Sequence, residues 1–141
     1  LRVPLTHDLV ASARTHPTLL ITRPDALADR RQAYADAGVE LADAGVDADG
    51  TMSAPAIAQA LGARGVTRVL VEGGSMLAAG LFRANLVDEI VWFRAPRVMG
   101  GDGVPAIAGF GLAHLDATPQ FTCVASEHAG ADIVETYRRA T

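Results

Sequence analysis

Residues 69–81 combine a short apolar run, a pair of glycines and a helix-forming segment, and this combination limits the possible folds more than any other stretch. The run Val-Leu-Val at 69–71 is typical of a buried strand, and Gly73 and Gly74 interrupt it. Ser75 is predicted to cap a helix that continues with small and apolar residues from 76 to 84. A buried strand that turns sharply into a helix indicates an α/β fold.

The glycine pair also predicts an anion site. The first amides of a helix have no partner within the helix, and glycines let a ligand come close to the backbone. A phosphate or pyrophosphate is therefore expected where the helix begins, with Glu72 as the acid beside it. The spacing matches neither a GxGxxG fingerprint nor a P-loop, so a purely structural connection between strand and helix stays open as the alternative.

Composition and charge restrict the class of protein. The 141 residues are 50% hydrophobic and 20% charged, as expected for one domain with a hydrophobic core. The net charge of −4 and the scattered arginines predict neither a nucleic-acid nor a membrane surface. The absence of lysine excludes a lysine base or Schiff base. The sequence has no signal peptide or membrane-length apolar run, so a cytoplasmic location is expected.

Cysteine and histidine give no sign of a metal site or a nucleophile. Cys123 is the single cysteine and lies in an alternating apolar run, so a packed thiol is expected. The sequence contains no HExxH motif, no paired carboxylates and no GxSxG motif. No metal is therefore expected, because metal-ligand spacing is missing at all four histidines: His7, His16, His114 and His128.

The first half of the chain alternates strands and helices. Prolines predict an irregular segment over residues 1–17, and the acidic segment 43–50 is expected to be a solvated loop. Gly38 is expected to end one helix and Ser53 to cap another. Strands are predicted at 18–22, 39–41 and 68–71, and helices at 25–37 and 54–63. This order of elements favours a parallel sheet.

The second half favours antiparallel pairing. The strand predicted at 90–95 is hydrophobic enough to be central, and Asn85 is placed to cap the end of the preceding helix. Residues 99–103 are expected to form a flexible loop. Strands at 121–126 and 133–138 are joined by a short loop, which predicts a hairpin. The whole chain is thus expected to form a mixed sheet that closes with an antiparallel hairpin.

Three motifs resemble the C-terminal reductase domain of the bifunctional riboflavin-biosynthesis deaminase–reductase family. They are Val-Glu-Gly-Gly at 71–74 with the helix that follows, Leu-Val-Asp-Glu-Ile at 86–90, and Ala-Pro-Arg-Val-Met-Gly at 95–100. Segments 111–115 and 119–121 and the turn from Gly130 to Asp132 also fit. The resemblance therefore runs in order along the whole chain, and three motifs at the spacing of the family make it specific.

The resemblance implies a fold and an activity. The family has a dihydrofolate-reductase-like α/β fold, with a mostly parallel twisted sheet, flanking helices and a C-terminal antiparallel hairpin. Its activity is the NADPH-dependent reduction of the ribosyl group of 5-amino-6-(5-phosphoribosylamino)uracil to ribityl. Hydride transfer needs no protein nucleophile, because the cofactor carries the chemistry. The resemblance places the substrate at Glu72 and NADPH along Gly73, Gly74, Ser75, Met76, Leu77, Ala78, Ala79 and Gly80, and it assigns no catalytic residue.

The resemblance also implies a homodimer that acts on a small phosphorylated ribosylaminopyrimidine. Trp92 and Phe93 are candidates for the dimer contact, with burial in the core of the monomer as the alternative. Ala79 and Gly80 reverse the order of glycine and small residue common in the family, but both remain small. The deaminase domain and the first strands of the reductase domain have no counterpart in residues 1–141, which are interpreted as the C-terminal portion of one reductase domain.

Two alternatives stay open. One is a dihydrofolate-reductase-like reductase of another pyrimidine or of a pteridine, because the glycine pair specifies the cofactor better than the substrate. The other is a non-catalytic module that binds a nucleotide or dimerises, which the lack of an autonomous catalytic residue favours.

Overall fold

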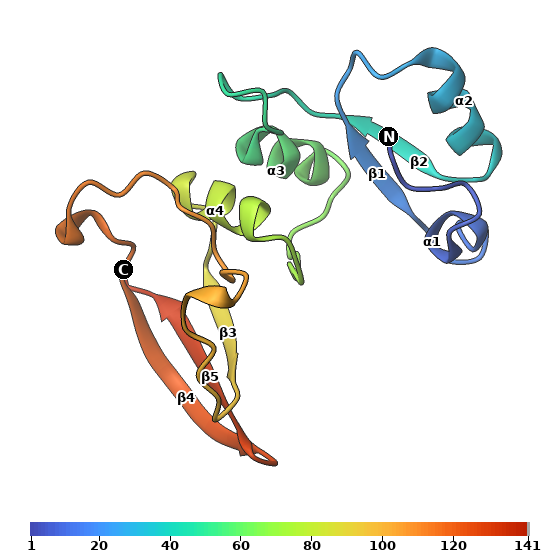
Figure 1. The fold of residues 1–141 in the computed structure, drawn as a ribbon. Helices are drawn as coiled ribbons and strands as arrows, with labels where there is room; N and C mark the ends of the chain where they lie inside the picture. The colour runs from blue at the N-terminus through green and yellow to red at the C-terminus, as the bar shows by residue number, and fades with distance from the viewer. Residues whose placement is uncertain (141) are drawn as a thin grey trace. The chain divides into compact units, whose positions relative to one another are not determined.

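The computed structural model describes residues 1–140, and the chain divides into two compact units between Val69 and Leu70 (Figure 1). The first unit contains α1, β1, α2, β2 and α3, and the second contains α4, β3, two short 3-10 helices, β4 and β5. None of the helices in the described part of the chain is long and apolar enough to cross a lipid bilayer.

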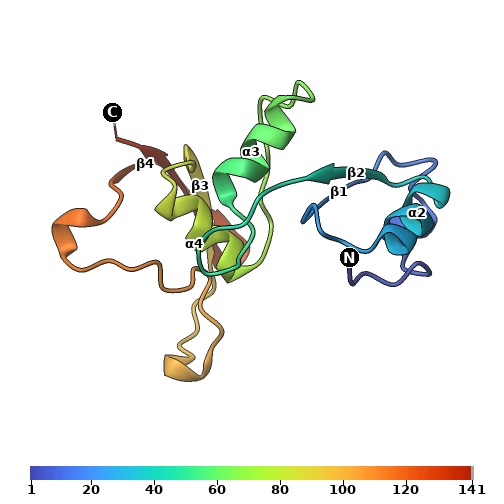
Figure 2. The same cartoon turned by 90° about the horizontal axis from the view of Figure 1, so that it is seen from above.

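A pair of parallel strands forms the centre of the first unit. β1 spans Leu19–Thr22 and β2 spans Glu40–Asp43, and the register places Leu20 opposite Leu41. The helices of this unit are α1 (Asp8–Ala11), α2 (Ala28–Asp36) and α3 (Ala54–Gly62). Figure 2 shows α2, which joins the two strands, running beside the pair. The parallel arrangement predicted for strands 18–22 and 39–41 is therefore confirmed.

The hydrophobic core of the first unit is built around Tyr34. This side chain is 1% exposed and is buried together with Val10, Ala13 and Val39. Its hydroxyl donates a hydrogen bond to the carbonyl oxygen of Val3. A buried tyrosine needs a partner for its O–H group, and this bond provides one, so the ring can fill the core without an unsatisfied polar atom.

Gly38 ends α2 as the sequence predicts. Its φ is +93°, and the amides of Gly38 and Val39 donate to the carbonyls of Ala35 and Tyr34 at 2.9 and 3.0 Å. This is the hydrogen-bond pattern of a Schellman motif, which places a left-handed residue directly after the helix. Glycine is favoured there because it has no Cβ to clash with the backbone.

The starts of the helices follow the sequence less closely. The predicted helix at 25–37 begins only at Ala28, because the chain first makes a turn in which the amide of Ala26 donates to the carbonyl of Arg23 at 3.2 Å. Ser53 takes the capping position of α3 as predicted, although its side chain makes no capping hydrogen bond.

The prediction of an irregular segment over residues 1–17 is wrong for residues 8–11, which form α1. His7 caps this helix, since its Nδ1 accepts a hydrogen bond from the amide of Leu9 at 3.2 Å. The hydroxyl of Ser12 donates to the carbonyl of Asp8 at 2.6 Å at the other end. Both prolines of the segment lie outside residues 8–11, so they do not prevent the helix.

The strand predicted at residues 68–71 does not form. Residues 66–74 carry no strand assignment, and Val69, Leu70 and Val71 are 53%, 78% and 43% exposed. A strand is stabilised by hydrogen bonds to a neighbouring strand, whereas an apolar run supplies only the side chains. The prediction is therefore wrong for these described residues, because the apolar run forms no ladder of backbone hydrogen bonds with another strand.

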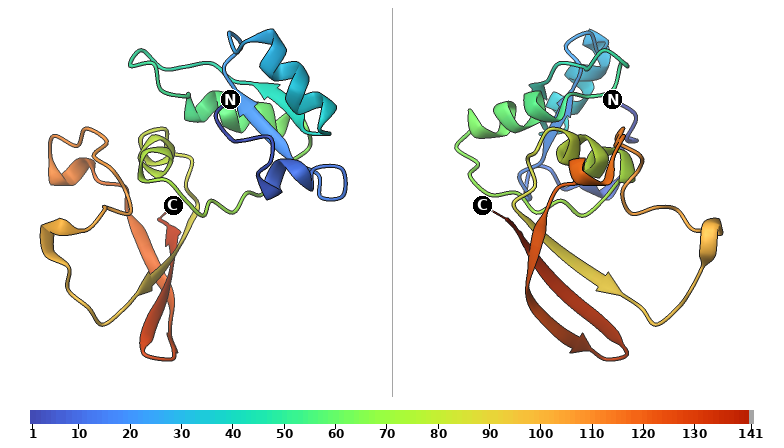
Figure 3. Two further views of the ribbon diagram at one scale, coloured as in Figure 1. Left: turned by 45° about the vertical axis from the view of Figure 1, so that its right-hand side comes forward. Right: turned by 90° about the vertical axis from the view of Figure 1, so that its left-hand side faces the viewer.

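An antiparallel sheet of three strands forms most of the second unit. It consists of β3 (Glu89–Arg94), β4 (Phe121–Ala129) and β5 (Asp132–Arg139) in the order β3-β5-β4. Figure 3 shows the long β4–β5 hairpin with β3 alongside β5. The predicted hairpin is confirmed, with the two residues between Ala129 and Asp132 as its loop. The predicted parallel and antiparallel pairings are both present, but they lie in two separate sheets.

Three expectations for the second unit are wrong. β3 is an edge strand rather than a central one, and Trp92 and Phe93 are 38% and 68% exposed rather than buried in the core. Cys123 is exposed rather than packed, because the antiparallel sheet leaves most of β4 open to solvent. The loop expected at 99–103 lies between β3 and β4 and contains a 3-10 turn at Gly100–Asp102.

Candidate functional site

The glycine pair meets a helix at the place that the sequence predicts. α4 spans Ser75–Arg83, and Gly74 is its N-cap with φ +85° and ψ +104°. Ser75 is thus the first residue of the helix, and the prediction that it caps the helix is wrong. The reason is the backbone of Gly74, which turns the chain with a positive φ that a residue without a Cβ adopts freely.

The amino end of α4 presents free backbone donors. The first hydrogen bond within the helix runs from the amide of Ala78 to the carbonyl of Gly74 at 3.0 Å. The amides of Ser75, Met76 and Leu77 precede this bond, so they have no acceptor within the helix. No side chain of the described residues caps them. An anion would satisfy these donors and would interact favourably with the positive end of the helix dipole.

The space in front of these donors is open. A Cβ added to Gly73 would meet no atom within 4 Å, and one added to Gly74 would meet only the Cβ of Leu77, at 3.8 Å. A ligand can therefore reach the backbone closely at both glycines. The residues present fit a phosphate or pyrophosphate group, which requires backbone donors and close approach more than charged side chains.

Glu72 lies immediately before the glycine pair and is exposed. Within residues 1–140 its carboxylate has no hydrogen bond or ion pair that would hold it away from a ligand. A free carboxylate accepts hydrogen bonds from hydroxyl and ring N–H groups. Glu72 is therefore able to bind the polar part of a ligand whose anionic part lies on α4.

The predicted cofactor segment divides along the helix. Met76 is 64% exposed, whereas Ala79 is 1% exposed and faces the interior of its unit. Gly80 is half-buried. With a rise of about 1.5 Å per residue, Ala79 lies roughly 7 Å along the axis from Gly74. The structure thus brings Glu72 and residues 73–76 together at the surface, and it uses Ala79 to pack the helix.

α4 is held at its amino end and along its buried face. The carbonyl of Ser75 accepts a hydrogen bond from the amide of Ala108 at 3.1 Å. The ring of Phe82 stacks on Phe110 and meets the edge of Phe121, with a distance of 5.9 Å between ring centroids in both pairs. These contacts fix the helix against the loop before β4 and against the start of β4.

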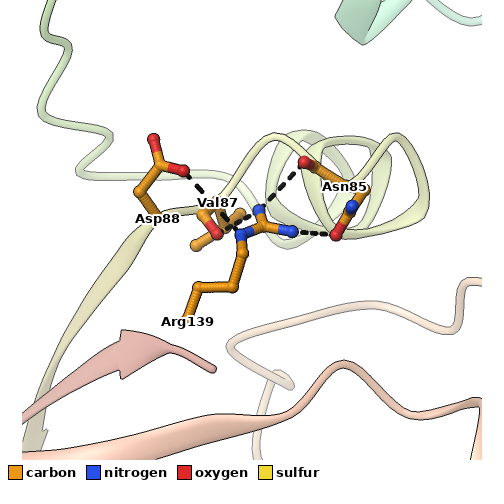
Figure 4. A network of polar contacts seen from close by, with 4 residues as sticks. All are labelled: Asn85, Val87, Asp88 and Arg139. Carbon is orange, nitrogen blue, oxygen red and sulfur yellow. Dashed lines mark hydrogen bonds and ion pairs between the residues drawn. The ribbon is translucent and has the colours of Figure 1, made fainter. Parts of the chain in front are cut away.

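The carboxyl end of α4 is closed by Asn85 and Arg139 (Figure 4). Asn85 has φ +57°, and its amide and that of Leu86 donate to the carbonyls of Phe82 and Leu81, which forms a second Schellman motif. The predicted capping role of Asn85 is confirmed. The guanidinium of Arg139, from the end of β5, donates to Asn85 and to the carbonyl of Val87. Sequence reasoning missed Arg139, because no local pattern links positions 54 residues apart.

A second concave surface lies on one face of the antiparallel sheet, and none of its residues belongs to the predicted site. Arg94 and Glu135 approach to 3.7 Å there. Desolvation, and then the neighbouring Glu135 carboxylate, raise the pKa of the Tyr137 hydroxyl above its usual value. Its lining residues are Ile90, Trp92, Arg94, Phe121, Glu135 and Tyr137.

Metal ligands do not gather in the described part of the chain. No group of three or more histidine, cysteine, aspartate or glutamate side chains lies close enough to hold an ion within residues 1–140. At the amino end of α4, the described residues offer anion binding by backbone amides and hydrogen bonding by a carboxylate.

Comparisons with known proteins show which family this arrangement resembles. A family model, the RibD C-terminal domain, matches residues 1–135. The riboflavin biosynthesis protein RibD of Escherichia coli (strain K12) is 36% identical over 73 residues, which are 52% of this chain and 20% of that protein.

Solved structures show the same fold. RibD of Acinetobacter baumannii has a TM-score of 0.77 at 19% identity, over 99% of this chain and 35% of that one. A pyrimidine reductase-like protein from Corynebacterium diphtheriae has a TM-score of 0.75 at 20% identity, over 99% of this chain and 57% of that one. The chain thus spans 20% to 57% of the length of these relatives, and the predicted α/β reductase-domain fold is confirmed.

Proposed function

This chain belongs to the RibD C-terminal domain family, and we propose that it takes part in the NADPH-dependent reduction of 5-amino-6-(5-phosphoribosylamino)uracil in riboflavin biosynthesis. The observation that carries the proposal is the amino end of α4, where three unpaired amides follow an open glycine pair and an exposed carboxylate. The RibD relatives support riboflavin biosynthesis as the process in which this reductase domain acts.

The residues have separate roles in this proposal. The amides of Ser75, Met76 and Leu77 bind the pyrophosphate of NADPH, and Gly73 and Gly74 let it approach. The remaining residues of the predicted cofactor segment, 78–80, pack the helix that carries these amides. The nicotinamide supplies the hydride when it is bound, so the task of the protein is to bind and orient.

Glu72 orients the sugar. Reduction adds a hydride to C1′ of the ribosyl group, breaks the bond from C1′ to the ring oxygen, and leaves that oxygen with a proton as a hydroxyl of the ribityl chain. A carboxylate that accepts hydrogen bonds from the ribosyl hydroxyls or the ring N–H groups fixes C1′ against the nicotinamide. We therefore assign orientation of the substrate to Glu72.

The proposal includes the location and the assembly of the protein. A small phosphorylated substrate and a dinucleotide cofactor belong in the cytoplasm, where we place the protein. The exposed apolar residues of β3 support a homodimer, since Trp92 and Phe93 lie open on an edge strand. Sedimentation of the chain over a range of concentrations tests this part, and a monomer at every concentration would contradict it.

A second candidate function is a non-catalytic module that binds a nucleotide. The openness of the site favours it, because Glu72, Gly73 and Gly74 are all exposed in their unit. A reductase of another pyrimidine or of a pteridine is the third candidate, and the pyrimidine reductase-like protein from Corynebacterium diphtheriae supports this broader substrate class.

One titration and one assay separate the candidates. NADPH is titrated into the purified chain and followed by its own fluorescence, and its oxidation is then followed with the ribosylaminouracil phosphate and with dihydrofolate. Binding with oxidation by the first substrate alone supports the proposal. Binding without oxidation by either substrate supports the module, and oxidation by dihydrofolate alone supports the broader class. Absence of binding contradicts the assignment of the amides on α4.

A further inference from the structure

Arg139 joins two parts of the second unit that are far apart in the sequence. It lies at the end of β5, four residues beyond the stretch that the family model matches, and its side chain is 26% exposed. Its Nη1 donates to the side-chain oxygen of Asn85, and its Nη2 donates to the carbonyls of Asn85, at 2.9 Å, and Val87. Its backbone amide donates to the carbonyl of Asp88 at 2.9 Å. Figure 4 shows the guanidinium beneath the turn that leaves α4.

This geometry fixes the exit from the helix. Asn85 holds a left-handed backbone conformation, which costs free energy for a residue with a Cβ. The guanidinium binds the carbonyl oxygen and the side-chain oxygen of that same residue, so it stabilises the turn in this conformation. It also brings a positive charge to the end of α4, where the helix dipole is negative. The planar fork of arginine reaches several acceptors at once, which an ammonium group does less well.

α4 depends on such anchors. A helix of nine residues is marginal in water by itself. Ala79 is its buried residue, so the apolar area that it removes from water is small. The contacts that hold it are the ring of Phe82, the bond from Ala108 to Ser75, and the turn bound by Arg139. The loss of one anchor therefore loosens the whole helix, including the amides at its other end.

We propose that Arg139 is a positioning residue for the cofactor end of α4, because it clamps the turn after that helix and so preorganises the amides of residues 75–77. The inference rests on the proposed function, since it assumes that these amides bind NADPH. Arg139 touches neither cofactor nor substrate in this proposal. Arg139 orders the helix before the ligand binds, so less conformational entropy is lost on binding.

Arg138 provides a matched control within the same strand. It is the neighbouring residue, carries the same charge and alternates to the opposite face of β5. Its Nε lies 3.0 Å from the Glu89 carboxylate, and the two side chains are 68% and 47% exposed. Substitution of Arg138 therefore removes the same charge without touching the turn after α4.

The test compares Arg139→Gln with Arg138→Gln in the complete chain. We expect the Kd for NADPH to rise about fivefold in Arg139→Gln, a change in binding free energy about the size of one net hydrogen bond. The Kd should stay unchanged in Arg138→Gln. Hydrogen exchange measured without NADPH should become faster for the amides of residues 78–84 in Arg139→Gln alone. Where substrate turnover is measured, the KM for NADPH should rise and kcat should change little.

The outcomes separate this inference from the proposed function. Equal exchange and equal Kd in the two variants would overturn the role of Arg139. If the parent chain does not bind NADPH, the proposed function fails, while the exchange of residues 78–84 still decides whether Arg139 holds the helix. If Arg139→Gln does not fold, Arg139→Lys replaces it. Exchange and NADPH affinity of Arg139→Lys equal to those of the parent chain would then overturn the inference.

Discussion

The two units of the chain bury apolar side chains to very different extents. Among residues 1–140, the first unit holds seven of the eight buried hydrophobic residues, with Tyr34 and Val10 the largest, whereas Ala79 is the buried hydrophobic residue of the second. The second unit exposes large apolar side chains on its sheet, such as Phe93. The first unit is therefore held by a core, and the second by strand pairing, aromatic contacts and the Arg139 clamp.

This difference suggests a division of roles. Residues packed in a core tolerate little change in volume. A helix held by a few polar and aromatic contacts can instead leave its first amides exposed to a ligand. The candidate site accordingly starts at Glu72, in the second unit. Substitutions in the first unit should thus alter stability most, and substitutions around Gly74 should alter binding most.

The largest effect is expected from Tyr34→Ala. Removal of a fully buried ring leaves a cavity and an unpaired acceptor at Val3, at a cost of about 3–5 kcal/mol in the free energy of unfolding. Tyr34→Phe removes only the hydroxyl and should cost about 1 kcal/mol. Hydrogen exchange of the β1 and β2 amides measures both changes.

The second unit has its own probe in this experiment. Trp92 is the single tryptophan of the sequence and lies on β3, so its fluorescence follows the second unit. We expect the free energy of unfolding reported by Trp92 fluorescence to fall less than the free energy derived from exchange of the β1 and β2 amides. Equal losses in both units would contradict the comparison between a unit held by a core and one held by anchors.

A smaller effect, on binding rather than folding, is expected from Gly74→Val. A branched residue at φ +85° costs about 1–3 kcal/mol of backbone strain, and its side chain enters the space in front of the free amides. The affinity for NADPH should fall at least about tenfold. Gly65→Val is the control, because Gly65 has φ +78° and a Cβ there meets no atom within 4 Å, so the change adds similar backbone strain outside the candidate site. Equal NADPH affinity in Gly74→Val and the parent chain would contradict the assignment of NADPH to this position.

Glu72→Gln should separate the substrate from the cofactor. The change keeps the size of the side chain but removes the charge that strengthens hydrogen bonds to hydroxyl groups. We expect the KM for the ribosylaminouracil phosphate to rise about tenfold and the Kd for NADPH to remain unchanged. A parallel loss of both affinities would show that Glu72 supports the loop instead of the substrate.

The sequence predicted the elements whose signals are local. Gly38 and Asn85 end helices because their own backbone geometry suits the turn, and the hairpin loop before Asp132 depends on adjacent residues. Glu72, Gly73 and Gly74 were likewise placed together at a helix start because they are neighbours in the chain.

Features that need a distant partner were not predictable in this way. An apolar run at 68–71 indicates a strand, but whether it pairs depends on a neighbour elsewhere in the chain. The exposure of Cys123 and the edge position of β3 depend in the same way on what covers the sheet. Arg139 is the clearest case, because its role appears only when β5 brings it to the turn after α4.

The smallest effect is expected from a surface charge of the first unit. Arg23 donates two hydrogen bonds to Asp25, and this pairing lowers the pKa of the Asp25 carboxyl. A carboxyl whose folded pKa is depressed contributes stability above its unfolded pKa of about 4, and this contribution is lost as the pH falls through the folded pKa. Acid should therefore weaken the first unit slightly through this group.

Two features make the contribution of Asp25 small. Both side chains are at least half exposed, so solvent screens the pair, and the residues are two positions apart, so the pair forms in the unfolded chain as well. Asp25→Asn should thus leave the midpoint of thermal unfolding nearly unchanged at neutral pH and slightly reduce its fall in acid. A large loss of stability at neutral pH would show that surface charge stabilises the first unit as much as the core around Tyr34 does.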